Sequence, residues 1–163
     1  MIRHPALVPL SRDHHLALLL ARAIQKAASV QLRGSLPAGV EALVKHVCLV
    51  FASELEGHFC VEEELLVEAV RGIDFELDAL CQDVVREHAV MRDLVRQLSE
   101  PDLSDSVTES LLDELGKTLE SHVRSEERAL YPRVERALGE SGLSKLGEAI
   151  QQRVNARAAT SRN

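Results

Sequence analysis

The stretch HFCVEEELL, residues 58–66, returns later in the chain as HVRSEERAL, residues 122–130. Both copies place a Glu four residues after a His, a second Glu directly after the first, and a closing Leu. On a helix, residues four apart lie on one face with Cβ atoms about 5–6 Å apart, so each His and its first Glu can reach a common point. A single pair of this kind is weak evidence, because helices often carry His and Glu. Two copies in register are far more specific.

The segments that precede these two copies also match each other. RDH at 12–14 corresponds to REH at 86–88, and each His is followed by apolar residues at plus 3, 6, 7 and 10. These apolar residues are Ala17, Leu20, Ala21 and Ile24 in the first segment, and Met91, Leu94, Val95 and Leu98 in the second. The spacing predicts two helices whose apolar faces begin at His14 and His88. The first two helices therefore look like a copy of the next two.

Helical periodicity dominates the chain, and no run alternates with period two over enough residues to predict a strand. We expect an all-α protein: an up-down-up-down four-helix bundle over about residues 10–138, with a short additional C-terminal helix over about 143–155. The whole chain, 1–163, is interpreted as one domain. The expected helices cover 16–28, 37–70, 74–98 and 106–138, with GESG at 139–142 as punctuation before the short helix.

Several residues mark the expected helix ends. Asp74 is the predicted N-cap of the third helix, and Gly72 can end the second. Ser106 and Glu109 match a capping box at the start of the fourth helix, and Pro132 should kink or break that helix. His4 precedes Pro5 in a segment expected to be irregular. This segment could fold over one end of the bundle, but a mobile terminus is the favoured interpretation.

Composition narrows the classes of function. The formal net charge of −7 supplies no basic footprint, so we expect neither a nucleic-acid partner nor an anionic membrane surface. No apolar run approaches the roughly 20 residues that a membrane span needs. The N-terminal MIRHPALVPL is too short and too broken by proline for a signal peptide. The three cysteines lack CxxC spacing and are interpreted as reduced thiols, which predicts a cytoplasmic protein.

The phasing of the four helices predicts a shared metal site in the bundle core. Its expected ligands are four imidazoles and two carboxylates: His14, His58, Glu62, His88, His122 and Glu126. Buried charge is costly unless it is paired or binds a metal, and this donor mixture suits iron, zinc or manganese. Two bridging Glu and two His per metal make four protein ligands at each, and an oxo or hydroxo bridge adds a fifth. A remaining position would be open to a small ligand.

Other residues near the motifs have lesser expected roles. His15 competes with His14, although His15 as ligand would turn Arg22 toward the core. Glu63 and Glu127 should point away from the ligand face, as supporting or solvent-exposed groups. Tyr131 is expected in the core with its hydroxyl at an edge.

Taken together, RDHH, HFCVEE, REHAVMRDL and HVRSEERALYP resemble the hemerythrin-like (HHE cation-binding) domains over roughly residues 10–138. The resemblance implies a four-helix bundle that holds two iron ions with a bridging oxygen. Carried over by motif, the ligands are the same six residues. Oxygen-carrying members have an additional His where this chain has Val84, which brings the sequence nearer to regulatory members of the family.

Together with this resemblance, the six-residue cluster predicts a small di-iron protein that binds or senses O₂, NO or iron. Two alternatives stay open: a di-iron redox enzyme, such as a peroxidase or an NO-handling enzyme, and a metal-stabilised interaction module without catalysis. No residue in the motifs commits the chain to a substrate or a protein partner, so whether it is an enzyme stays open.

Overall fold

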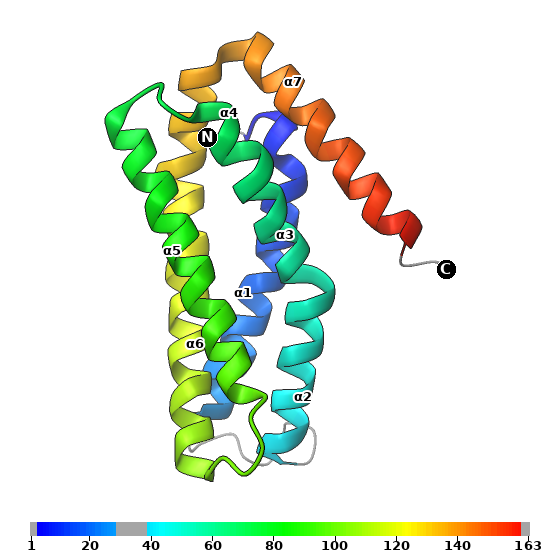
Figure 1. Ribbon diagram of the computed structural model, residues 1–163, viewed down its shortest axis with the longest axis vertical. Helices are drawn as coiled ribbons and strands as arrows, with labels where there is room; N and C mark the ends of the chain where they lie inside the picture. The colour runs from blue at the N-terminus through cyan, green and yellow to red at the C-terminus, as the bar shows by residue number, and fades with distance from the viewer. Residues whose placement is uncertain (1–2, 29–38, 161–163) are drawn as a thin grey trace.

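The chain folds into helices that stand side by side, as the computed structural model shows (Figure 1). The structure describes residues 3–28 and 39–160, and no strand occurs within these ranges. The elements are η1 (Pro5–Leu7), α1 (Val8–Ala28), α2 (Val40–Val50), η3 (Phe51–Leu55), α3 (Glu56–Val61), η4 (Glu62–Leu66), α4 (Val67–Val70), α5 (Phe75–Leu98), α6 (Asp105–Ser125), η5 (Glu126–Leu130) and α7 (Tyr131–Thr160). Of these, η1 is a 3₁₀ turn, and η3, η4 and η5 are π turns.

Four helical rods form the bundle, and they alternate in direction along the chain (Figure 1). The first is α1, and the second runs without interruption from α2 to α4, through two π turns. The third is α5, and the fourth is α6 with η5 and the beginning of α7. The all-helical bundle predicted from periodicity is therefore observed. After Gly139 the rest of α7 turns back along the outside of the bundle (Figure 1).

The helix ends agree with most of the sequence signals. The Asp74 side chain accepts a hydrogen bond from the backbone N–H of Glu76 and caps α5, as expected. Gly72 has φ 73°, a left-handed conformation that favours glycine and stops the preceding rod. The capping box at Ser106 is wrong: Ser104 is the N-cap of α6 and accepts from Val107 N–H, two residues earlier than predicted. Pro37, the expected start of the second helix, lies outside the described residues.

The expected break at Pro132 takes a different form. The chain keeps helical dihedrals through Pro132, and the change of hydrogen-bond pattern comes just before it, in η5. The change of direction comes later, at Gly139, where φ is 57° and ψ is −175°. The residues predicted as a separate helix over 143–155 belong to α7, on the far side of this kink.

Two apolar clusters fill the bundle on either side of a polar layer. One cluster is formed by the second half of α1, the rod from α2 to α3, the last part of α5, and α6. It includes Leu20, Val47, Leu94 and Leu115. The other gathers η1, α4, the first half of α5 and α7. Between them lie buried His and Glu side chains, so the core is interrupted at the level of the repeated motifs.

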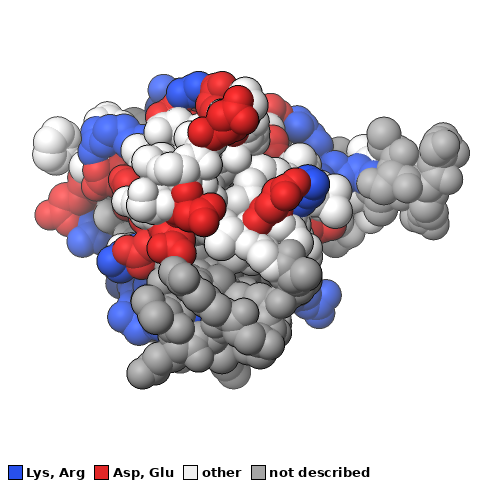
Figure 2. All heavy atoms as spheres, turned by 90° about the horizontal axis from the view of Figure 1, so that it is seen from below, with Lys and Arg blue, Asp and Glu red and all other residues white. Residues whose placement is uncertain are grey.

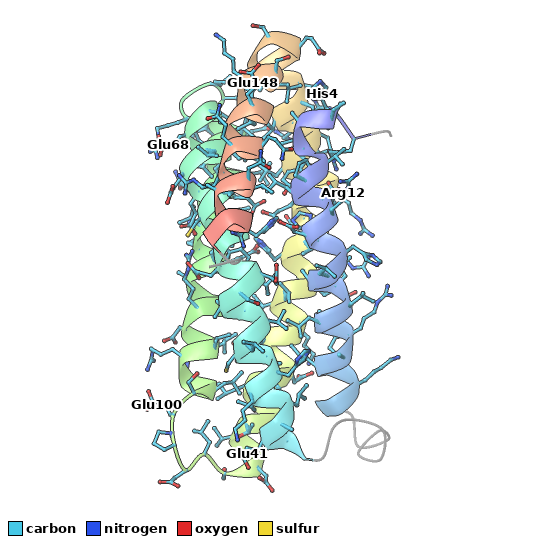
Figure 3. The ribbon with its side chains drawn as sticks, turned by 90° about the vertical axis from the view of Figure 1, so that its right-hand side faces the viewer. His4, Arg12, Glu41, Glu68, Glu100 and Glu148 are labelled. Atoms are coloured by element: carbon cyan, nitrogen blue, oxygen red, sulfur yellow. The ribbon has the colours of Figure 1, made fainter. Side chains whose placement is uncertain are left out.

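The outer surface mixes charges of both signs. Seen from the end where α2 begins, acidic and basic side chains stand among uncharged ones (Figure 2). Figure 3 places Glu41 and Glu100 at this end, and His4 with Glu148 at the opposite end. Among the described residues, every helix is either too short or too polar to cross a bilayer.

Candidate metal centre

The six residues predicted as metal ligands lie together in the polar layer. Each is at most 2% exposed, although such side chains are usually found at protein surfaces. His14 comes from α1, His58 and Glu62 from the second rod, His88 from α5, and His122 and Glu126 from the fourth rod. His15 is exposed, so the structure brings His14 and not His15 into the cluster.

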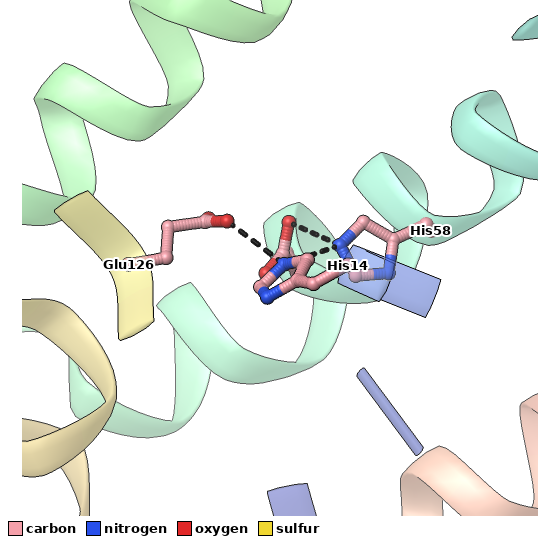
Figure 4. Close-up of side chains that lie close together, drawn as sticks. His14, His58 and Glu126 are labelled. Carbon is pink, nitrogen blue, oxygen red and sulfur yellow. Dashed lines mark hydrogen bonds and ion pairs between the residues drawn. The ribbon is translucent and has the colours of Figure 1, made fainter. Parts of the chain in front are cut away.

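The imidazoles form two facing pairs. The Nε2 atoms of His14 and His58 are 3.1 Å apart, and those of His88 and His122 are 3.2 Å apart. Figure 4 shows His14 between His58 and Glu126, with all three side chains turned toward one another. The two pairs correspond to the two halves of the sequence repeat: the first pair joins α1 to the second rod, and the second pair joins α5 to the fourth.

Each carboxylate reaches one imidazole of each pair. Glu62 Oε2 lies 3.3 Å from His58 Nε2 and 3.4 Å from His88 Nε2. Glu126 Oε2 lies 3.0 Å from His14 Nε2 and 3.2 Å from His122 Nε2. Two donor sets therefore share both carboxylates, and within each set the four ligand atoms lie within 4.8 Å of one another.

Contacts among the donor atoms leave buried carboxylate oxygens without hydrogen bonds, and bound metal ions would satisfy them. Glu62 Oε2 and both carboxylate oxygens of Glu126 are buried and make no hydrogen bond. An ionised carboxylate left this way costs several kcal/mol or more, unless a cation compensates it. Burial, and then the charge of Glu62, raise the pKa of Glu126 well above its usual range. Burial also opposes charge on Glu62, but the imidazoles of His58 and His88 outweigh it and lower the pKa of Glu62. Two divalent ions would remove this conflict.

A second ring of carboxylates holds the outer side of the imidazoles. Glu127 Oε1 lies 2.8 Å from His14 Nδ1, and Glu63 Oε1 lies 2.8 Å from His88 Nδ1. Glu63 and Glu127 thus act as supporting groups, one of the two roles expected for them. An Nδ1–H donated to a carboxylate leaves the Nε2 lone pair free for a metal.

Two members of this ring, Asp13 and Glu87, were not among the predicted site residues. Asp13 Oδ2 lies 3.3 Å from His58 Nδ1, and Glu87 Oε2 lies 2.7 Å from His122 Nδ1. The signal was present, since an acidic residue directly precedes the His in both RDH and REH. Each acid lies beside the imidazole of a neighbouring helix and not beside the His that follows it in the chain.

Two aromatic side chains make the halves of the centre unequal. The Tyr131 hydroxyl donates to Glu62 Oε1 at 2.6 Å and lies 3.3 Å from His14 Nε2. The expectation of a hydroxyl at an edge is wrong, because Tyr131 is fully buried. On the other side, the Phe59 ring stacks on His88 with centroids 3.8 Å apart. The positions that correspond in the repeat, Val67 and Val123, carry neither group.

A buried His and Glu cluster at the middle of a helical bundle defines a class of cation-binding domain. The chain matches the family model described as "Hemerythrin HHE cation binding domain" over residues 6–144, and it belongs to this family. Comparison with curated proteins and with solved structures gave no significant match. At the position of the additional family His, Val84 is buried in the apolar cluster, consistent with a centre of four imidazoles.

Proposed function

We propose that the chain binds two iron ions, with an oxo or hydroxo bridge, between the two imidazole pairs. His14 and His58 would hold one ion, His88 and His122 the other, and Glu62 and Glu126 would bridge them. The observation that carries this proposal is the pair of overlapping donor sets whose carboxylate oxygens have no hydrogen-bond partner. Imidazole with carboxylate suits iron, although zinc or manganese can occupy such a donor set.

The function that this centre supports best is the binding or sensing of O₂ or NO. Iron in such a centre can bind these diatomic ligands at an open position. The surrounding chain would contribute a dry pocket, because an apolar cluster packs on each side of the polar layer. Tyr131 adds a buried hydroxyl to this pocket, whose O–H donates to Glu62 Oε1. A cytoplasmic location fits the three free cysteines.

Metal analysis of the purified protein is the direct test. We expect two metal ions per chain, and fewer than one in the His58→Ala and Glu126→Ala variants. His46→Ala is the matched control, since His46 is exposed on the same rod and should retain both ions. Absorption bands of the iron-loaded protein should change with O₂ or NO. A wild-type protein that takes up no metal, or variants that keep both ions, would refute the proposal.

A redox enzyme is the second candidate, and Tyr131 favours it. A phenol 2.6 Å from a proposed bridging carboxylate could pass a proton to a bound peroxide or NO-derived group. Turnover of hydrogen peroxide or NO by the iron-loaded protein, reduced at least tenfold in Tyr131→Phe, would support this function. If chelation lowers the melting temperature but no gas or peroxide response exists, a metal-stabilised module is the better description.

A further inference from the structure

The N-terminal segment 3–7, here called the N-terminal strap, packs on the end of the bundle beside α7. Ala6 and Leu7 are buried in the apolar cluster of that end, instead of forming the mobile segment that was expected. The fit is close, since a Cβ added at Gly147 of α7 would lie 3.0 Å from the Ala6 Cβ. The His4 backbone N–H donates to Glu135 Oε1 at 2.9 Å, and the His4 ring lies 3.4 Å from a Glu140 oxygen.

Arg3 connects this strap to the metal centre. Its Nη2 donates to Glu127 Oε2 at 2.6 Å, and its Nη1 donates to Glu135 Oε1 at 3.2 Å. The other oxygen of Glu127 contacts His14 Nδ1 and accepts from the Ser11 hydroxyl at 2.6 Å. The guanidinium also lies 5.0 Å from the centre of the Tyr131 ring. A chain of three side chains thus runs from the strap to a ligand: Arg3, Glu127, His14.

The backbone of the fourth rod gives Arg3 a second partner. In the π turn η5, the Tyr131 N–H donates to the Glu126 carbonyl, five residues back. In the same pattern the Glu127 carbonyl would receive the N–H of residue 132, which is a proline and has none. Arg3 Nη2 donates to this carbonyl at 2.9 Å. The π turn and Pro132 therefore create an acceptor, and the strap supplies its donor.

The other half of the centre has an equivalent chain that does not depend on the strap. Arg92 Nη1 donates to Glu63 Oε1 at 2.7 Å, and the same oxygen contacts His88 Nδ1. Arg92 lies in the middle of α5 and also binds Glu56. Each half thus has an Arg–Glu–His chain, but one guanidinium is fixed on a long helix and the other on a terminal strap.

We propose that Arg3 is a positioning residue for the metal site, through which the N-terminal strap holds the half formed by His14 and His58. This inference rests on the proposed function for its metal, but the chain Arg3–Glu127–His14 is a property of the protein alone. Carboxylates that orient a ligating imidazole contribute about 10–100-fold to metal affinity. Loss of the guanidinium should reduce affinity by up to this range at one ion only.

The matched variants Arg3→Ala and Arg92→Ala test this proposal, with Zn²⁺ as a diamagnetic probe. In Arg3→Ala we expect one of the two zinc ions to be released to a chelator about 10–100-fold faster, and the other at the wild-type rate. The ¹⁵N imidazole resonances should shift for His14, and not for His88. Arg92→Ala should give the opposite pattern. Glu140→Gln, which loosens another contact of the strap but does not touch Glu127, should change neither.

Measurement of the same resonances in the metal-free protein separates this inference from the proposed function. If the wild type binds neither zinc nor iron, the proposed function fails, while the His14 shift in metal-free Arg3→Ala still supports the chain from the strap. If the wild type binds two ions and Arg3→Ala changes neither release nor the His14 resonance, only this inference is overturned. Equal effects at His14 and His88 would also overturn it, because they indicate general loosening. Arg3→Lys, which keeps a positive charge, serves if Arg3→Ala does not fold; we expect a smaller shift at His14 alone.

Discussion

At the scale of single residues, the support of each imidazole depends on which acid reaches Nδ1 from a neighbouring helix. Glu87 contacts His122 at 2.7 Å, although Glu87 lies on α5 and His122 on α6. The carboxylate holds Nδ1–H in place, so that Nε2 turns toward the centre. Mutation of such an acid should therefore affect metal binding more than folding.

Replacement of Glu87 by Gln tests this effect. The amide can still contact His122 but cannot match a carboxylate as acceptor, so metal affinity should fall about 10–100-fold. The measurement is competition with a chelator of known affinity. Asp83→Asn is the control, since Asp83 lies one turn earlier on α5 and pairs with Arg86 at the surface. Equal affinity in both variants would show that Glu87 does not orient the imidazole.

Cys81 illustrates how burial and a neighbouring charge lower the reactivity of a thiol. Burial, and then the charge of Asp78, raise the pKa of this thiol to about 11. The thiolate is the reactive form, so at pH 8 Cys81 should react about 100-fold more slowly with iodoacetamide than a thiol of ordinary pKa. Its rate should rise about tenfold per pH unit and level off only above pH 11. Mass spectrometry of the alkylated peptides gives the rates, with the less buried Cys48 as internal reference. Equal rates at the two residues would contradict the expected burial effect.

The sequence predicted the six residues of the inner cluster because periodicity fixes which face of a helix a residue occupies. It did not predict the partners of Asp13 or the hydroxyl position of Tyr131. Those depend on how neighbouring helices are placed along their axes, and no pattern within one helix reports this. Phasing and the match of RDH to REH favoured His14 over His15, and His14 is the one that lies in the buried cluster.

At the scale of elements, the helical periodicity of the sequence did not predict the π turns. Both η4 and η5 begin at a glutamate of the cluster, Glu62 and Glu126. A π turn adds a residue to the helical turn, which rotates the side chains that follow relative to those before, and such turns are frequent at functional sites. It also changes the partners of the backbone carbonyls. Arginines donate to carbonyls of these turns: Arg3 to that of Glu127 in η5, and Arg157 to those of Ser53 and Glu54 in η3.

Gly139 is the other element-scale feature, and it allows α7 to turn back along the bundle. With φ 57° and ψ −175° its backbone is in a region essentially limited to glycine, where other residues are strained by about 1–3 kcal/mol. We expect Gly139→Ala to reduce the free energy of unfolding by about this amount. Nothing lies within 4 Å of an added Cβ, so a steric clash would not contribute.

Urea denaturation measures this loss, and hydrogen exchange locates it. Exchange should accelerate in α7 after the kink and not in α5. Ser141→Ala, an exposed helical position two residues on, should change stability by no more than about 0.5 kcal/mol. If Gly139→Ala is as stable as the wild type, the left-handed conformation is not required at this kink.

At the scale of the whole molecule, the polar layer divides the core into two apolar clusters. All four rods contribute a ligand candidate to this layer, so metal binding would join them at their middle. Without metal the layer holds carboxylate oxygens with no hydrogen-bond partner and weakens the bundle where it should be strongest. Metal removal should therefore lower the stability of the entire fold and not that of one helix.

Chelation of the loaded protein tests this coupling. An ion present at about 1,000 times its dissociation constant stabilises the folded state by about 4 kcal/mol, so two ions contribute about 8 kcal/mol. For a chain of this size, each kcal/mol corresponds to about 2–4 °C, and chelation should lower the melting temperature by roughly 15–30 °C. Metal binding displaces protons from imidazole and carboxylate donors, so the difference between loaded and chelated protein should shrink as the pH is lowered. The Glu126→Ala variant should show little difference at any pH. A melting temperature that does not respond to chelation in the wild type would mean that the polar layer is stable without metal, and that the orphaned carboxylate oxygens find another partner.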